Sequence, residues 1–311
     1  MQLASFSLTR RVFLASALVA SFFFGSNSAA RADEPNYQPI SNVVYKKVGD
    51  REIKLNLFLP VKDGQTLKGE PLLIFLDSGC WYSGEPGDGG LWRSIGAIER
   101  GFAIASVSHR PINEAKFPAQ MEDVRAAVRF LRKHASEYGY DPERFAVAGY
   151  SSGGNLSLTL GISDEKSIFN VGDNLDVSGQ VQRVIDYYGP ADLAFVFERY
   201  SKQAIDCIYD AFGFDRKLVD KSNEEYYANV QELAKKYSPI TYVDENFAPT
   251  LIFQGTEDPL VPLSQSALMF EALRVAGVRS QLIVGDGGVH DPRTVTSINM
   301  AIREIFEFLR W

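Results

Sequence analysis

Two short runs of this chain, residues 72–76 and 145–148, are apolar at every position. A strand with one face in water alternates apolar and polar residues, whereas a strand that is apolar throughout is covered on both faces. Such strands occur mainly in parallel sheets, where helices connect one strand to the next and cover the sheet. These two runs therefore predict an α/β domain built on a mostly parallel sheet.

Eight runs rich in β-branched or aromatic residues predict strands, because turn residues bound each of them. They cover residues 43–48, 53–59, 71–77, 102–109, 145–148, 184–188, 250–254 and 281–284. Apolar residues at helical spacing predict helices over residues 118–134, 155–161, 264–275 and 294–308. After two opening strands, strand and helix alternate, which predicts a mostly parallel eight-stranded sheet flanked by helices.

The composition narrows the possible classes of protein. With 45% hydrophobic residues among 311, the chain buries a large core, and no linker or repeat divides it. The formal net charge of −7 argues against a protein that binds nucleic acid through bulk positive charge. Cys80 and Cys207 are the only cysteines, so neither a disulfide framework nor a four-thiolate zinc site is available. We expect packing to supply the stability, and the sequence leaves open whether these two residues pair.

The first 32 residues have the layout of an export signal. They carry three arginines and no acidic residue, with an apolar run over residues 12–24 and an A-x-A pattern at residues 30–32. The run is too short to cross a bilayer, so we expect a signal peptide cleaved before Asp33, which leaves no membrane span. Arg10 and Arg11 directly before the run predict the twin-arginine type, with an ordinary secretory leader as the alternative. Either signal predicts a periplasmic or secreted protein.

Residues 193–238 show the weakest periodicity and are rich in aromatic residues. They lie between the sixth and seventh predicted strands, so we interpret them as a cap inserted into a single domain that spans residues 33–311. Their aromatic side chains either line a substrate pocket or pack a small core of the cap itself, and the sequence leaves both open.

The segment Gly149-Tyr150-Ser151-Ser152-Gly153 joins a predicted strand directly to a predicted helix. The pattern G-x-S-x-G alone is weak, since glycine and serine are common. In this strand-turn-helix context, however, it is typical of a serine nucleophile held on a tight turn at a helix N-terminus. Ser151 is therefore the candidate nucleophile, and a plain strand-helix turn is the alternative.

A serine nucleophile needs a base, usually a histidine that a carboxylate orients. Of three histidines, His290 lies in a glycine-led loop after the last predicted strand, whereas His109 and His134 have positions that favour structural or surface roles. The loop after the seventh strand offers Asp258, with Glu257 as the competing carboxylate. The order serine, aspartate, histidine is the one expected for this triad on an α/β sheet.

Stabilising the oxyanion of such a reaction requires backbone N–H donors. We expect one from Ser152, which follows the candidate nucleophile, and others from Gly79 and Cys80 in the loop after the third predicted strand. No metal-ligand spacing accompanies these residues, so we expect neither a metal nor a cofactor.

Several further segments resemble the esterase/lipase superfamily of α/β-hydrolases, near the hormone-sensitive-lipase-like enzymes and the bifunctional feruloyl and acetyl xylan esterases. The segments that carry the resemblance are residues 117–124, 141–144, 187–193, 238–240, 255–262, 265–266 and 276–278. The resemblance implies an α/β-hydrolase fold and hydrolysis of carboxylic esters without a cofactor. Together with the export signal, it favours acetyl or other short acyl groups on small molecules or extracellular carbohydrate. It says nothing of the oligomeric state.

One departure from this family concerns the donor loop. Relatives typically carry His-Gly-Gly-Gly-Trp, where this chain has Asp77-Ser78-Gly79-Cys80-Trp81. Side chains restrict how the loop presents its N–H groups, and an ionised Asp77 disfavours an oxyanion unless backbone N–H groups or Arg110 hold the carboxylate away. We therefore expect slow turnover of generic nitrophenyl esters.

Two other functions compete with ester hydrolysis. A serine peptidase on the same fold is disfavoured, because the sequence shows no propeller-forming partner domain. A non-catalytic binding protein is suggested by the altered donor loop and disfavoured by the presence of all three triad candidates.

Overall fold

The computed structural model describes residues 36–82, 86, 96–194, 201–215, 217, 223–296 and 298–310. The leader expected over residues 1–32 lies outside the described residues, as do parts of the expected cap. In the described part of the chain, no helix is both long and apolar enough to span a membrane.

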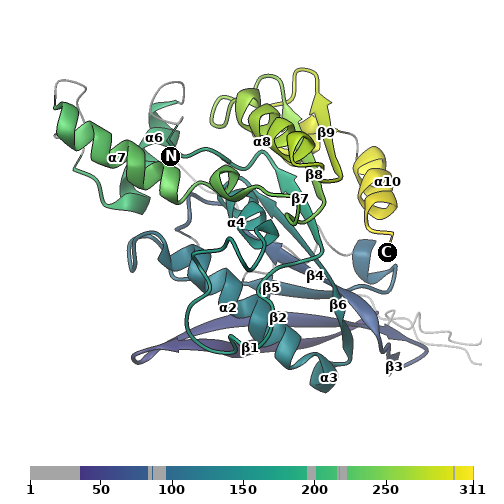
Figure 1. Ribbon diagram of the computed structural model, residues 1–311. Helices are drawn as coiled ribbons and strands as arrows, with labels where there is room; N and C mark the ends of the chain where they lie inside the picture. Colours follow the sequence, from purple (N-terminus) through teal and green to yellow (C-terminus); the bar gives the residue numbers. More distant parts are fainter. Residues whose placement is uncertain are drawn as a thin grey trace, which may run out of the picture. The chain divides into compact units, whose positions relative to one another are not determined.

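Within these residues, nine strands form one sheet in the order β1-β2-β5-β4-β6-β7-β8-β9, and β3 pairs with β2 (Figure 1). They are β1 (Tyr37–Val48), β2 (Arg51–Lys62), β3 (Gln65–Thr66), β4 (Glu70–Leu76), β5 (Ala103–Val107), β6 (Tyr140–Tyr150), β7 (Arg183–Tyr187), β8 (Thr250–Gly255) and β9 (Ser280–Gly285). The pairs from β5 through β4 to β9 are parallel, and the pairs of β2 with β1, β3 and β5 are antiparallel. The expected eight-stranded, mostly parallel sheet is confirmed, with β3 as a short addition.

The helices are α2 (Ala119–Lys133), α3 (Ala135–Tyr138), α4 (Ser152–Gly161), α6 (Lys202–Phe212), α7 (Glu224–Lys236), the 3-10 helix η1 (Pro239–Tyr242), α8 (Leu263–Val275), α9 (Pro292–Val295) and α10 (Ile298–Phe308). The single helix predicted over residues 294–308 is wrong, because Thr296 is extended and separates α9 from α10. The described part of the expected cap holds α6 and α7 (Figure 1).

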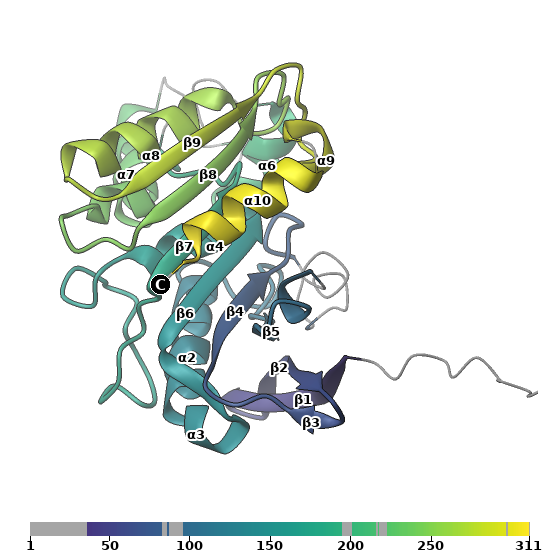
Figure 2. The same cartoon turned by 90° about the vertical axis from the view of Figure 1, so that its right-hand side faces the viewer.

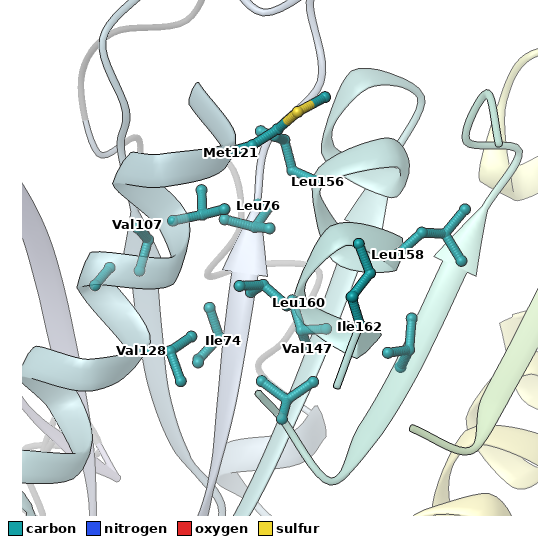
Figure 3. Close-up of a cluster of buried hydrophobic side chains, with 14 of the residues drawn as sticks. Ile74, Leu76, Val107, Met121, Val128, Val147, Leu156, Leu158, Leu160 and Ile162 are labelled. Carbon is teal, nitrogen blue, oxygen red and sulfur yellow. The ribbon is translucent and has the colours of Figure 1, made fainter. Parts of the chain in front are cut away.

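Side chains of β4 point alternately to the two faces of the sheet, and both faces are covered. Leu72 and Ile74 join a core with α2 and α4, while Leu73 and Phe75 join a second core that includes Phe308 of α10. Figure 3 shows the first core, with apolar side chains of α2 and α4 packed on β4 and β6. In Figure 2, α10 lies in front of the sheet and α2 behind it. Burial on both faces explains why the run at residues 72–76 is apolar throughout.

Candidate active site

Ser151 stands between the end of β6 and the start of α4, where it caps the helix with φ 56° and ψ −117°. Its N–H donates a hydrogen bond of 2.9 Å to the carbonyl oxygen of Tyr187. A residue with a side chain rarely adopts this left-handed conformation, and it persists only where the surroundings hold it. The motif at residues 149–153 therefore forms the strained turn that a serine nucleophile requires.

Two glycines of the motif allow this turn to lie close to neighbouring backbone. A Cβ atom on Gly149 would lie 2.2 Å from the carbonyl oxygen of Gly153, and one on Gly153 would lie 2.3 Å from that of Leu76. Any side chain at either position would overlap main-chain atoms, which have little room to move. The first turn of α4 thus packs directly on the end of β4, and this contact brings Ser151 beside the donor loop.

Asp258 and His290 meet at the carboxyl end of the sheet, in the loops after β8 and β9. The Nδ1 atom of His290 lies 2.7 Å from Oδ2 of Asp258, whose side chain is fully buried, and the imidazole is 16% exposed. The other carboxylate oxygen, Oδ1, accepts the N–H groups of Leu260 (2.8 Å) and Val261 (2.9 Å). These donors hold the carboxylate in place, and the histidine keeps its Nε2 atom for another partner.

Two residues that the sequence analysis missed support this pair. The Gln254 amide donates to Oδ2 of Asp258 (3.3 Å) and accepts from the Ser266 hydroxyl (2.8 Å). The ring of Tyr188 packs on the ring of His290, with centroids 4.4 Å apart. A polar glutamine directly after the apolar residues 251–253 was a usable signal in the sequence for Gln254. Tyr188 lies in one of the segments that resemble the family, but no pattern there pointed to a contact with His290.

The other candidates for the base and for the carboxylate have different surroundings. Glu257 is exposed. His109 is buried beside the Arg110 carbonyl oxygen (3.0 Å), and this burial lowers the pKa of its imidazole. His134 is partly exposed and lies 3.0 Å from Glu137. The expectation that these two histidines are structural or surface residues agrees with their positions.

Two cavities meet at Ser151. The larger has a volume of about 130 Å³ and is lined mainly by residues that carry polar groups, which are Ser78, Tyr150, Ser151, Tyr188, His290 and Asp291, together with Pro292. The smaller has a volume of about 40 Å³ and is mainly apolar, and its lining includes Cys80, Trp81, Ser152, Cys207, Ile208 and Val261. Ser151 and His290 thus line one cavity, while Ser151 and Ser152 line the other.

The donor loop has an unusual backbone, because Gly79, Cys80 and Trp81 all have positive φ, of 114°, 54° and 58°. Cys80 is joined to Cys207 of α6 by a disulfide bond, a pairing that the sequence left open. We expected packing to supply the stability, and this bond adds a covalent cross-link to it. Two of the expected donors, Gly79 and Cys80, lie in the donor loop, and the third, Ser152, lies at the start of α4. Cys80 and Ser152 line the smaller cavity together with Ser151.

The carboxylate of Asp77 accepts the backbone N–H of Ser78 at 2.8 Å. Arg110 instead forms an ion pair with the buried Asp123 at 2.8 Å. The sequence suggested that either backbone N–H groups or Arg110 could bind the Asp77 carboxylate, and the structure shows a backbone N–H in this position and not Arg110.

This contact gives a prediction for the donor loop. Because a backbone N–H already holds the Asp77 carboxylate, any gain must come from the loop backbone, which replacing Asp77 with His and Ser78 with Gly frees from this contact and from one side chain. We expect kcat for a nitrophenyl ester to rise, by up to about 10²-fold, because one well-aimed donor contributes about that much. Steady-state kinetics of the double variant measure this. An unchanged or lower kcat would show that the native loop already presents its N–H groups.

A buried carboxyl lies directly behind the turn that holds Ser151. Burial raises the pKa of Asp186 on β7 to about 8, although the N–H of Gly189 donates to its Oδ1 atom at 2.9 Å. Its Oδ2 atom is buried without a hydrogen-bond partner among the described residues. The folded protein therefore holds this side chain protonated near neutral pH.

Asp186 should make the stability of the protein depend on pH. An unfolded aspartate titrates near about 4, so between about pH 4 and 8 the unfolded state loses a proton that the folded state keeps, and stability falls as the pH rises. We expect the free energy of unfolding to lose on the order of 3–6 kcal/mol over this range through Asp186 alone. Urea unfolding of the wild type and of Asp186→Asn at pH 4.5 and pH 8 measures the difference. The same pH dependence in both proteins would contradict it.

Among the described residues, no group of three or more His, Cys, Asp or Glu side chains is arranged to hold a metal ion. Ser151 and His290 line one cavity, and Asp258 is bonded to His290.

Comparison with known proteins gives related sequences and structures. The esterase LipQ of Mycobacterium tuberculosis (strain ATCC 25618 / H37Rv) is 27% identical over 208 residues, which are 67% of this chain and 46% of LipQ. A probable isoprenylcysteine α-carbonyl methylesterase, ICMEL1 of Oryza sativa subsp. japonica, is 25% identical over 246 residues, 76% of this chain and 54% of the relative. The chain spans about half the length of these curated relatives.

A solved structure described as a truncated form of a carbohydrate esterase from gut microbiota superposes with a TM-score of 0.72 at 25% identity, covering 89% of this chain and 98% of that one. The model of the BD-FAE family matches residues 55–273, a span that includes Ser151 and Asp258 and ends before His290. Since this match covers more than half of the sequence and the sheet has the expected topology, the chain belongs to the BD-FAE family and has the α/β-hydrolase fold.

Proposed function

We propose that this protein is a serine hydrolase of carboxylic esters. The observation that carries the proposal is the bond between Asp258 and His290 at the cavity that Ser151 lines, with Ser151 on its left-handed turn. Names of relatives such as the esterase LipQ support the same class of reaction.

In this mechanism, Oγ of Ser151 attacks the ester carbonyl while Nε2 of His290 accepts its proton. The imidazolium that forms is stabilised by Asp258, which is bonded to the opposite ring nitrogen. The ester oxygen then leaves with the proton from His290, and the acyl group stays on Ser151. Water attacks this acyl-enzyme while His290 accepts a proton from the water, and the proton then passes to Oγ of Ser151 as the acid is released.

Negative charge develops on the carbonyl oxygen during both attacks. The N–H of Ser152 lies in the first turn of α4, where backbone N–H groups have no acceptor within the helix and the helix dipole favours an anion. We assign the remaining donors to Gly79 and Cys80, whose loop lies against the start of α4.

The two cavities suggest which esters fit. Since roughly 10–15 Å³ of such space admits one group the size of water, the apolar cavity of about 40 Å³ holds about three such groups. That space suits an acetyl, propionyl or butyryl group. The larger cavity carries polar groups of Ser78, Tyr188 and Asp291 and suits an alcohol with further hydroxyl groups, and the carbohydrate esterase that resembles this chain supports a sugar ester.

Export is part of the proposal. Disulfide bonds persist mainly in oxidising compartments outside the cytoplasm, and the bond between Cys80 and Cys207 therefore supports the export expected from residues 1–32. A protein that crosses the membrane already folded, through the twin-arginine route, would form this bond in the periplasm or outside the cell.

Labelling with a fluorophosphonate probe tests the proposed reaction. We expect the probe to attach to Ser151, as located by peptide mass, and a panel of acetyl, butyryl, octanoyl and feruloyl esters to show a preference for short acyl groups. A folded protein that takes up no probe and cleaves none of the esters would favour a non-catalytic binding protein. A preference for octanoyl over acetyl esters would overturn the short-acyl assignment.

A further inference from the structure

The disulfide bond between Cys80 and Cys207 connects two segments that are 127 residues apart in sequence. Cys80 belongs to the donor loop after β4, and Cys207 lies in the middle of α6, with the two Cα atoms 5.5 Å apart. The bond therefore joins the loop that we assign to the oxyanion with a helix of the expected cap.

Both cysteines also line the apolar cavity beside Ser151. Helix α6 contributes Ala204 and Ile208 to the same lining, and Ile208 is 2% exposed. An acyl group attached to Ser151 and directed into this cavity would contact the wall that the disulfide and α6 form. The position of α6 relative to Ser151 thus limits the length of that acyl group.

The donor loop needs support from outside, because Cys80 and Trp81 are consecutive residues with positive φ and neither is glycine. The disulfide supplies support at Cys80. The ring of Trp81 packs on Phe117 with centroids 5.0 Å apart, and its carbonyl oxygen accepts the N–H of Ile112 at 3.1 Å.

A second contact joins the same two segments without lining the cavity. The hydroxyl of Tyr82 donates to the carboxylate of Asp210 on α6 at 2.6 Å. Tyr82 is 46% exposed and belongs to neither cavity lining. This contact offers a matched comparison, since it connects the donor loop to α6 but forms no wall of the pocket.

We propose that the disulfide between Cys80 and Cys207 sets the acyl-chain specificity of the enzyme and positions its donor loop. The proposal rests on the ester hydrolysis proposed above. With the bond intact, α6 closes the cavity around a short acyl group and the loop is fixed beside Ser151. A dithiol reductant would supply two electrons and two protons, break the S–S bond to give two thiols, and itself become a disulfide. Helix α6 would then lose its covalent link to the wall of the cavity at Cys80, and longer acyl chains would enter.

The test compares the wild type with the double variant Cys80→Ser/Cys207→Ser, which keeps every backbone N–H group. Values of kcat and KM are measured for the acetyl, butyryl and hexanoyl esters of nitrophenol. We expect the hexanoyl-to-acetyl ratio of kcat/KM to rise at least about tenfold, since each methylene in an apolar pocket changes specificity by about that factor or more. We also expect kcat for the acetyl ester to fall with little change in KM, because a displaced donor acts on the transition state.

Tyr82→Phe is the control, and its acyl-chain ratio should equal that of the wild type. If the double variant does not fold, the wild type treated with dithiothreitol, with two thiols counted per chain, gives the same comparison. An unchanged ratio in an active protein that lacks the bond overturns the proposal, as does an equal change in Tyr82→Phe. A wild type that cleaves no ester and takes up no fluorophosphonate overturns the proposed function instead.

Discussion

Ser151→Ala and His290→Ala should each lower kcat for ester hydrolysis by about 10⁶-fold, the loss found when a serine triad loses its nucleophile or its base. The loss is this large because the triad acts as a unit: an alanine at position 151 forms no acyl-enzyme, and without the imidazole the serine hydroxyl keeps its proton. Steady-state kinetics on the best ester of the panel measure the effect, and circular dichroism shows whether each variant is folded.

His134→Ala is the control for these two variants, because His134 is partly exposed and lies in the connection between α2 and α3. We expect its kcat to stay within about twofold of the wild type, because His134 lines neither cavity. Residual activity above a few per cent in folded Ser151→Ala would contradict the assignment of the nucleophile, and the same activity in folded His290→Ala would contradict the assignment of the base.

Features that depend on neighbours in sequence were predictable. The turn at Ser151 joins a strand and a helix that are adjacent along the chain, so its glycines and its position were visible in the motif. Asp258 and His290 are 32 residues apart, yet both follow strands of one parallel sheet. The carboxyl ends of parallel strands lie at one edge of a sheet, which is why the positions of these residues after two strands predicted that their side chains lie close together.

Features that depend on contacts between distant segments were not predictable. The sequence left the pairing of Cys80 with Cys207 open, because only the placement of α6 over the donor loop brings them within reach. The positive φ values of Cys80 and Trp81 were unexpected for the same reason. A residue with a side chain adopts that conformation only when tertiary contacts hold it, and such contacts leave no local pattern.

The start of β6 shows how local rules are overridden. Proline usually disfavours a strand interior, and Pro142 lies before the predicted strand, which began at residue 145. In the structure, β6 begins at Tyr140. Tyr140 pairs with Glu70 and Phe145 with Leu72, so the segment around Pro142 is an irregularity with three extra residues opposite β4. A proline is tolerated there because the ladder requires no N–H from it.

Asp258→Asn should lower kcat by about 10⁴-fold with the fold intact, the loss known for a triad whose histidine is held in the wrong tautomer. The N–H groups of Leu260 and Val261 both donate to Oδ1, so the amide oxygen of an asparagine would take that position. Its NH₂ group would then face Nδ1 of His290. A donor there forces Nδ1 to accept, and a neutral imidazole then carries its proton on Nε2, the atom that must receive the proton of Ser151.

The neighbouring Glu257→Gln removes an equal charge from the same loop and serves as the matched control. Glu257 is exposed, whereas the Asp258 side chain is fully buried against His290. We expect kcat of Glu257→Gln within about twofold of the wild type, because an exposed charge is screened by solvent. Kinetics of both variants at pH 8, with fluorophosphonate labelling of Ser151 as a second readout, separate the two carboxylates. If Asp258→Asn kept its rate and its labelling, or if Glu257→Gln lost as much, the orienting group would be a different residue from Asp258.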